Sequence, residues 1–314
     1  MHANWMSLGC LLAVILVGPS PAGEAPAARP APFRVVGYLP EYRTFDPAAA
    51  VHLTDLILFS AEPTEAGGLD LRRMRRMPWA DLRAFKTRHP LRLLLCVGGG
   101  GRSAHFPAVA GSDAKRAAFV RSAVRVCLDE RLDGIDLDWE HPRNEAEQTG
   151  YASLMGELRE AFRPHGLTLS AALAGWQKLP PKAFAALDWV HVMAYDHPGR
   201  HATFEAAQAD VRKLSAAGAP ASKLTLGLPF YGRNVTNPDR EAVYRDIVAK
   251  HRPGPDVDEI DGMYFNGRHT IARKTAYALE QGLAGVMVWE LGQDAAGSES
   301  LLKEIRAVVD RPRR

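Results

Sequence analysis

The stretch Leu132-Asp-Gly-Ile-Asp-Leu-Asp-Trp-Glu-His-Pro142 places Asp136, Asp138 and Glu140 at alternate positions of a segment that otherwise has the character of a buried strand. Successive side chains of a strand point to opposite faces, so the three carboxylates share one face, with Cα spacings of about 6.5 Å. The apolar residues between them, with Trp139, take the other face. Burying one unpaired carboxylate costs several kcal/mol, so three on one face indicate chemistry rather than structure.

Two other interpretations of this stretch are open. The acids could lie at a solvated strand end and pair with basic neighbours. A calcium loop is disfavoured, because the sixth position counted from Asp136 is His141, where the tight turn of such a loop needs Gly.

From residue 33 onward, short apolar runs alternate with amphipathic segments. The runs predicted as strands are Arg34–Tyr38, Asp55–Ser60, Leu91–Val97, Gly134–Glu140, Thr168–Leu173, Val190–Tyr195, Leu224–Pro229 and Gly285–Glu290. The segments predicted as helices are Trp79–Thr87, Asp113–Asp129, Asn144–Phe162, Thr203–Ala217, Arg240–His251 and His269–Gln281. The strands are brief and rich in branched residues or leucine, as parallel strands buried on both faces are. Eight strand–helix repeats predict an α/β fold with a single (β/α)8 TIM barrel.

A doubly wound open sheet is the alternative to the barrel. It is disfavoured because no Gly-x-Gly-x-x-Gly turn opens the first helix, and because the glycine run 98–101 lacks the Lys-Ser/Thr of a phosphate-binding loop. Catalytic groups of parallel barrels lie at the carboxyl ends of the strands. The predicted strands place Glu140, Tyr195-Asp196, Tyr231-Gly-Arg233 and Trp289-Glu290 at one such mouth.

These motifs resemble those of glycoside hydrolase family 18, the chitinases and their relatives. The family's Asp-x-x-Asp-x-Asp-x-Glu appears as residues 133–140, and its Met-x-Tyr-Asp appears as residues 193–196. Further matches are Gly227-Leu-Pro-Phe-Tyr-Gly-Arg233 and Gly285-Val-Met-Val-Trp-Glu290, so the resemblance spans residues 34 to about 292. One departure is Cys96-Val-Gly-Gly99, where the family has Ser at the first position.

The resemblance implies a role for each residue of these motifs. Glu140 would be the general acid. Asp138 would hold the 2-acetamido group of the substrate, whose carbonyl oxygen attacks the anomeric carbon in place of an enzyme nucleophile. Asp136 would exchange a proton with Asp138, because neighbouring carboxylates cannot all ionise easily. Tyr195 would donate its hydroxyl to the acetamido oxygen.

Substrate contacts are expected from a second group of residues, which consists of Asp196, Met193, Trp289, Tyr38, Tyr231 and Arg233. Asp196 would accept a hydrogen bond from a sugar hydroxyl, and Trp289 would offer a flat apolar face below the sugar. No cofactor is implied. His141 and His197 follow catalytic strands, but two histidines without further ligands do not make a metal site.

The expected activity is hydrolysis of β-1,4-linked N-acetylglucosamine chains, chitin or its oligosaccharides, with retention of configuration. An N-acetylglucosaminidase acting on peptidoglycan or N-glycans is an alternative, as is a chitinase-like lectin that binds without cutting. The lectin is disfavoured because Asp136, Asp138 and Glu140 are all retained. The expected partner is therefore an N-acetylglucosamine-containing oligo- or polysaccharide, bound by a monomer.

Composition agrees with this class of protein. The chain has 314 residues, 46% of them hydrophobic, which is ample for a large core. Its 39 basic and 36 acidic residues leave a formal charge of +3, and the basic residues are dispersed, which argues against a nucleic-acid partner.

The amino terminus carries a pattern typical of export. The apolar run Leu8–Gly18 is too short to span a bilayer and fits the core of a signal peptide, with Ala22 and Ala25 as possible cleavage positions. We expect a signal peptide over 1–25, a Pro/Ala-rich linker over 26–33 and the catalytic barrel over 34–311. The mature protein would then be secreted or periplasmic and would have no membrane association.

Cleft shape follows from one short segment. Many relatives insert a small α+β domain between the last two barrel strands, whereas Arg233 and His269 here are only 36 positions apart. The predicted helix Arg240–His251 occupies much of that span. We therefore expect a barrel without the α+β insertion domain and an open, shallow groove.

Overall fold

The computed structural model describes residues 1–2 and 32–312, so most of the expected signal peptide and linker lies outside the described residues. Eight parallel strands form the centre of the fold. They are β1 (Arg34–Pro40), β2 (Asp55–Pro63), β4 (Arg92–Gly98), β5 (Gly134–Asp138), β6 (Thr168–Ala174), β7 (Trp189–Met193), β8 (Leu224–Pro229) and β13 (Gly285–Trp289). Each pairs with the next, and β13 returns to β1 with Gly285 opposite Arg34, which closes the sheet and confirms the (β/α)8 barrel.

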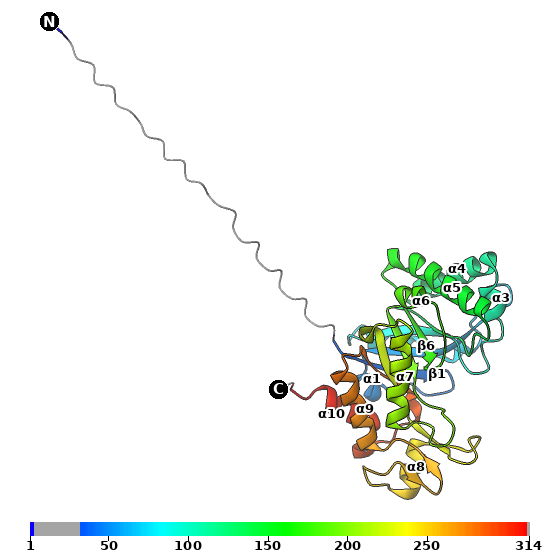
Figure 1. Ribbon diagram of the computed structural model, residues 1–314, viewed down its shortest axis with the longest axis vertical. Helices are drawn as coiled ribbons and strands as arrows, with labels where there is room; N and C mark the ends of the chain where they lie inside the picture. The colour runs from blue at the N-terminus through cyan, green and yellow to red at the C-terminus, as the bar shows by residue number, and fades with distance from the viewer. Residues whose placement is uncertain (3–31, 313–314) are drawn as a thin grey trace. The chain divides into compact units, whose positions relative to one another are not determined.

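Helices surround the barrel, and Figure 1 shows α9 and α10 side by side at its flank. The helices are α1 (Pro47–Ala50), α2 (Trp79–Lys86), α3 (Phe106–Ala110), α4 (Asp113–Glu130), α5 (Glu145–Phe162), α6 (Pro181–Ala186), α7 (Phe204–Ala216), α8 (Tyr244–His251), α9 (Arg268–Glu280) and α10 (Leu301–Val309). The long helices begin at polar caps: the side chains of Ser112, Asn144 and Thr203 accept backbone N–H groups of α4, α5 and α7. Within the described residues, none of the helices has the length and apolar character needed to cross a membrane.

Side chains along β5 alternate between the hydrophobic core outside the barrel and the barrel interior. Ile135 and Leu137 are fully buried in the shell between barrel and helices, whereas Asp136 and Asp138 point into the barrel. Trp139 continues the outer face as expected, with its ring centroid 5.3 Å from that of Phe106 in a stacked arrangement. The strand ends at Asp138, two residues earlier than predicted, so Glu140 lies in the loop beyond it.

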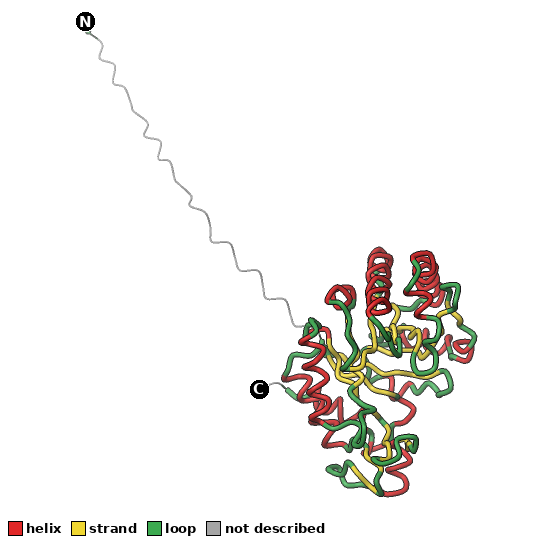
Figure 2. The backbone as a smooth tube through the Cα atoms, turned by 45° about the vertical axis from the view of Figure 1, so that its right-hand side comes forward, coloured by secondary structure: helices red, strands yellow, loops and turns green. Residues whose placement is uncertain are grey.

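The segment between β8 and β13 is more structured than the sequence indicated. It forms the antiparallel strands β9 (Tyr231–Asn234), β10 (Glu241–Val243), β11 (Glu259–Ile260) and β12 (Met263–Tyr264), in the order β10-β9-β12-β11. These strands lie close to α8 in Figure 2. A two-residue strand, β3 (Leu69–Asp70), also pairs with the end of β2.

The start of the predicted helix Arg240–His251 is therefore wrong. Residues 241–243 pair with β9, with Val243 opposite Tyr231, and the helix begins only at Tyr244. Pairing with β9 supplies the backbone hydrogen bonds that a first helical turn would otherwise have to provide. The small sheet with α8 remains far smaller than a domain, so the segment between β8 and β13 adds no second domain to the described barrel.

Candidate active site

The carboxyl ends of the barrel strands surround a cavity of about 340 Å³. Its lining residues are Tyr38, Tyr42, Phe59, Gly100, Arg102, Asp138, Glu140, Ala172, Met193, Tyr195, Asp196, Arg233 and Trp289. Most of the residues singled out from the sequence are in this set. The two that are not, Asp136 and Tyr231, each bond to a residue that is: Asp136 to Tyr38 and Tyr231 to Asp196.

Asp136 lies below the cavity and has no solvent exposure. Both of its oxygens are occupied: Tyr38 donates to Oδ2 at 2.6 Å, and Ser170 donates to Oδ1 at 2.7 Å. Burial raises the pKa of Asp136 to about 6, although these hydrogen bonds and one from Cys96 favour the charged form. With a pKa of about 6, this carboxyl is mostly ionised at neutral pH and gains a proton in mildly acidic solution.

The nearest ring nitrogen does not neutralise Asp136. Nε2 of His191 lies 3.6 Å from Oδ1 of Asp136, but burial, together with the charge of Arg34, lowers the pKa of His191 to about 3. Nδ1 of the same ring lies 2.7 Å from the hydroxyl of Thr225. Because this imidazole is neutral, Asp136 can exchange a proton only with its neighbouring carboxyl, Asp138.

Asp138 stands between Asp136 and Glu140 along the chain and is 3% exposed. Burial raises its pKa well above the usual value, and the charges of Glu140 and Asp136 raise it further. Within the described residues its Oδ1 atom is buried without a hydrogen-bond partner. A buried, unpaired acceptor that lines a cavity costs free energy unless a ligand supplies the donor.

Glu140 follows β5 and lines the mouth of the cavity, with 30% of its side chain exposed. Burial raises its pKa, the negative charge of Asp196 raises it further, and a hydrogen bond from the backbone N–H of Gly100 lowers it. The position of Glu140 is fixed by the loop: the hydroxyl of Ser103 accepts its backbone N–H at 3.1 Å and donates to the carbonyl of Asp138. A carboxyl with a raised pKa can donate a proton near neutral pH.

A second polar cluster lines the far wall. The hydroxyl of Tyr231 donates to Oδ1 of Asp196 at 2.5 Å, and Nε of Arg233 lies 2.9 Å from the same oxygen. Burial alone would raise the pKa of Asp196, but hydrogen bonds from His201 and Tyr231 and the charge of Arg233 outweigh burial and lower it. Asp196 is therefore charged at neutral pH, and both Tyr231 and Arg233 come from β9 of the small sheet.

Aromatic rings form the floor. Trp289, at the end of β13, packs edge-on against Phe59 and Tyr38, with ring centroids 4.7 and 5.4 Å away. Met193 and Tyr195 pack against the same apolar cluster inside the barrel, and Tyr195 Oη lies 4.0 Å from the sulfur of Met287. The hydroxyl of Tyr195 thus has no strong partner among its described neighbours, whereas that of Tyr38 is committed to Asp136.

Sequence reasoning missed several lining residues. Arg102 pairs with the buried Glu41 at 3.0 Å and lies 4.8 Å from the ring of Phe59, and Tyr42 extends from the loop after β1. The glycine run 98–101 also belongs to this wall: Gly100 lines the cavity, and at Gly99 a Cβ atom would lie 2.4 Å from the ring of Phe59.

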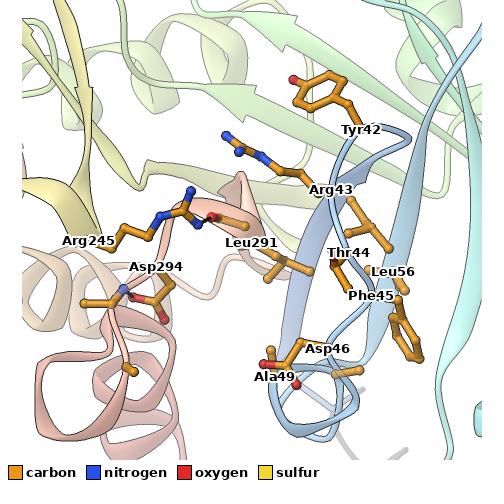
Figure 3. A pocket seen from close by; sticks show the side chains of 15 residues that line it. Tyr42, Arg43, Thr44, Phe45, Asp46, Ala49, Leu56, Arg245, Leu291 and Asp294 are labelled. Atoms are coloured by element: carbon orange, nitrogen blue, oxygen red, sulfur yellow. Dashed lines mark hydrogen bonds between the residues drawn. The ribbon is translucent and has the colours of Figure 1, made fainter.

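A second cavity, of about 420 Å³, lies beside the first and shares Tyr42 with it. Figure 3 shows Arg43 and Arg245 extending toward each other from opposite sides of this cavity. Nε of Arg43 pairs with the buried Glu290 at 2.8 Å, and Arg245 donates to the carbonyl of Gly292. Those contacts tie the loop after β13 to the loop after β1 and to α8.

The described residues offer no group of three or more His, Cys, Asp or Glu side chains arranged to hold a metal ion. The carboxyls at the cavity have raised pKa values: the buried pair Asp136 and Asp138, and Glu140 at the mouth.

Comparisons with known proteins agree with this geometry. Residues 34–294 match the sequence profile described as Glycosyl hydrolases family 18. The chain is 28% identical over 298 residues to Probable chitinase 2 of Drosophila melanogaster. The match covers 69% of this chain and 62% of that protein. The first relatives of this kind are longer, so the chain spans less than two thirds of their length.

Solved structures show the same fold. The GH18 chitinase ChiB from the chitin utilization locus of Flavobacterium johnsoniae superposes with a TM-score of 0.77 at 30% identity, over 88% of this chain and 94% of that one. A chitinase-like agglutinin from Robinia pseudoacacia superposes with a TM-score of 0.74 at 25% identity, over 87% and 99% of the two chains. With the profile match across the whole barrel and the carboxyl series on β5, these likenesses show that the chain belongs to family 18 of the glycosyl hydrolases.

Proposed function

We propose that the protein is a glycosidase that hydrolyses β-1,4-linked N-acetylglucosamine chains, chitin or its oligosaccharides, with retention through the substrate's own acetamido group. The observation that carries the proposal is the pairing of Asp138 with Glu140. Asp138 presents a buried, unpartnered Oδ1 to the cavity, and Glu140 at the mouth has a raised pKa. Asp138 is therefore suited to accept a hydrogen bond from a substrate N–H, and Glu140 is suited to donate a proton.

The first step can be written with these groups alone. Oδ1 of Asp138 accepts the acetamido N–H and orients the group, and the acetamido carbonyl oxygen attacks the anomeric carbon. The bond to the leaving sugar breaks as Glu140 transfers its proton to the glycosidic oxygen. The products are a cyclic oxazolinium ion on the enzyme and a free sugar hydroxyl. The positive charge on the nitrogen of the oxazolinium ring is balanced by the carboxylate of Asp138.

The second step reverses the first with water. Glu140, now a carboxylate, takes a proton from the water that opens the oxazolinium ring at the anomeric carbon. Two inversions at one carbon give net retention. Asp136 supports both steps, because its pKa of about 6 allows it to share a proton with Asp138 as the charge on the substrate rises and falls.

The remaining residues act on the substrate or on the acids. Tyr195, whose hydroxyl has only the sulfur of Met287 nearby, would donate to the acetamido oxygen. Asp196 and Arg233 would bind sugar hydroxyls, Trp289 would form the floor and Met193 its apolar side. We assign Tyr38 and Tyr231 to orienting Asp136 and Asp196, because each hydroxyl is already bonded to that acid.

A lectin without activity is the second candidate, and the fold shared with the Robinia agglutinin favours considering it. The retained carboxyl series argues against it. An N-acetylglucosaminidase acting on peptidoglycan or N-glycans would use the same chemistry on another chain. We further propose that the protein acts as a monomer after export to the cell exterior or periplasm.

One set of incubations separates these candidates. Chito-oligosaccharides, purified peptidoglycan and an N-glycan are each incubated with the protein, and products are identified by mass spectrometry. Release of N-acetylglucosamine oligomers from the first substrate supports the proposal, and release from peptidoglycan or the glycan alone would move the activity there. Binding without any product would identify the lectin.

The acetamido step has its own test. An oligomer that is fully deacetylated at the cleavage site lacks the attacking oxygen and should stay intact, and a thiazoline mimic of the cyclised sugar should inhibit competitively. Trapping a covalent sugar on Asp136 or Asp138 would contradict substrate assistance.

A further inference from the structure

Trp176 is an exposed tryptophan that the catalytic cavity does not use. In the described part of the chain the exposed large hydrophobic side chains are Met1, Tyr42, Val51, Leu128 and Trp176. The two aromatic ones both lie in loops at the carboxyl ends of barrel strands, Tyr42 after β1 and Trp176 after β6. Tyr42 lines the cavity, whereas Trp176 is 58% exposed and lies outside it.

The backbone that carries Trp176 is held from both sides. Gln177 is 5% exposed, and it accepts the N–H of Ala174 with its side chain at 2.5 Å and donates its own N–H to the carbonyl of Ala174 at 2.9 Å. On the other side, Gly175 presses against Asp210 so closely that a Cβ atom would lie 2.3 Å from its carboxyl carbon. The indole is therefore presented to solvent by a fixed turn. An apolar ring held in water in this way indicates a binding surface.

The ring stands next to the proton donor. Its centroid lies 4.7 Å from that of His141 at an interplanar angle of 65°, and Nε2 of His141 lies 3.9 Å from Oε2 of Glu140. Neither His141 nor Trp176 lines the cavity that holds Asp138 and Trp289. Glu140 thus separates the cavity from the indole.

We propose that Trp176 is the stacking platform for the sugar that leaves, the N-acetylglucosamine unit on the far side of the scissile bond. The inference rests on the proposed function. The sugar that is attacked must sit over Asp138 inside the cavity, so the glycosidic oxygen lies at Glu140 and the next sugar lies beyond it, where the indole is. Gly100, which also adjoins Glu140, has no side chain to offer there. An apolar sugar face on an indole would be worth about tenfold in affinity.

Two substrates that differ only in the leaving group test this. A chito-oligosaccharide has a leaving sugar that can reach Trp176, whereas the disaccharide of N-acetylglucosamine carrying fluoride at its anomeric carbon has a leaving group too small to do so. Trp176→Ala should lower kcat/KM about tenfold for the oligosaccharide and leave that for the fluoride unchanged. Trp176→Phe should recover most of the loss. Leu128→Ala, which removes another exposed apolar side chain on α4, serves as the matched control and should change neither value.

The outcomes separate cleanly. Equal losses on both substrates would mean that Trp176 only supports the fold around Glu140, and no loss on either would mean that the leaving sugar does not contact it. Both results overturn the inference and leave the proposed function standing. If the unaltered protein cleaves neither substrate, the proposed function fails first and the inference falls with it.

Discussion

The hydroxyl of Tyr38 donates a 2.6 Å hydrogen bond to Oδ2 of Asp136, which joins β1 to β5 inside the barrel. This bond favours the charged carboxylate and opposes the effect of burial on its pKa. Ser170 occupies the other oxygen, so the orientation of Asp136 is fixed from two strands. The proton balance beneath the cavity depends on this contact.

Tyr38→Phe should move the acidic limb of the kcat/KM profile to higher pH. Without the donor the charged form loses a stabilising bond, so the pKa of Asp136 rises further above its value of about 6. The profile is measured on a chito-oligosaccharide from pH 4 to 9. Tyr277→Phe on α9 is the control, and an acidic limb at the same pH in both variants would show that Asp136 does not set it.

Glu140→Gln should reduce turnover by about a hundredfold or more while binding survives. The amide keeps the shape of the side chain but cannot protonate the leaving oxygen. Turnover and the Kd of an N-acetylglucosamine oligomer are measured side by side. Glu65→Gln, at an exposed position away from the cavity, is the matched control. Near-normal turnover in Glu140→Gln would remove this residue from the role of acid.

Asp196→Asn should move the alkaline limb to lower pH. The negative charge of Asp196 raises the pKa of Glu140, which must be protonated to act. Removing that charge lowers the pKa of Glu140, so the acid loses its proton earlier as pH rises. The change is read from kcat as well as kcat/KM, because Tyr231 and Arg233 also lose their shared partner. A higher KM with the alkaline limb at the same pH would contradict the electrostatic effect of Asp196 on the pKa of Glu140.

Lys274→Met should remove a pH dependence of stability. Lys274 is fully buried, donates to Asn266 at 2.7 Å and Ala202 at 2.9 Å, and burial lowers its pKa to about 7. Above pH 7 the unfolded chain binds this proton more readily than the folded one, so stability rises with pH up to the ordinary lysine range, by at most about 1.4 kcal/mol per unit.

Urea unfolding at pH 7 and pH 9 checks this relation. The stability of the unaltered protein relative to Lys274→Met should be greater at pH 9 than at pH 7. Lys182→Met, at an exposed lysine on α6, should show no such difference. A constant gap between the two proteins would mean that the lysine keeps its proton in the fold.

A time course on a long soluble substrate should show intermediate lengths before short products. Between β8 and β13 the described chain holds the small β9–β12 sheet, α8 and α9, and this segment is far too short to build a deep tunnel wall. A chain in an open groove leaves after each cut. Accumulation of disaccharide from the start, with intermediates absent, would point to processive or exo-acting cleavage.

The sequence alone predicted the barrel and most of the cavity, because both depend on local patterns. Side chains of a strand alternate between its two faces, so Asp136 and Asp138 must face away from Ile135 and Leu137. This assignment requires no information on the rest of the fold. Strand ends in a parallel barrel share one mouth, so Glu140, Tyr195 and Trp289 could be brought together from their positions in the chain.

The tertiary structure decided what depends on contacts between distant residues. The hydroxyl of Tyr38 could have faced a sugar, and only the closure of the barrel, which places β1 across the interior from β5, commits it to Asp136. Residues 241–243 carried a helical pattern, but pairing with β9 overrides weak local propensity. The sequence did not single out Trp176, because a lone tryptophan forms no periodic pattern or motif with its neighbours. Its exposure beside Glu140 exists only once Gln177 and Asp210 fix the turn, since burial and proximity are properties of the packed chain.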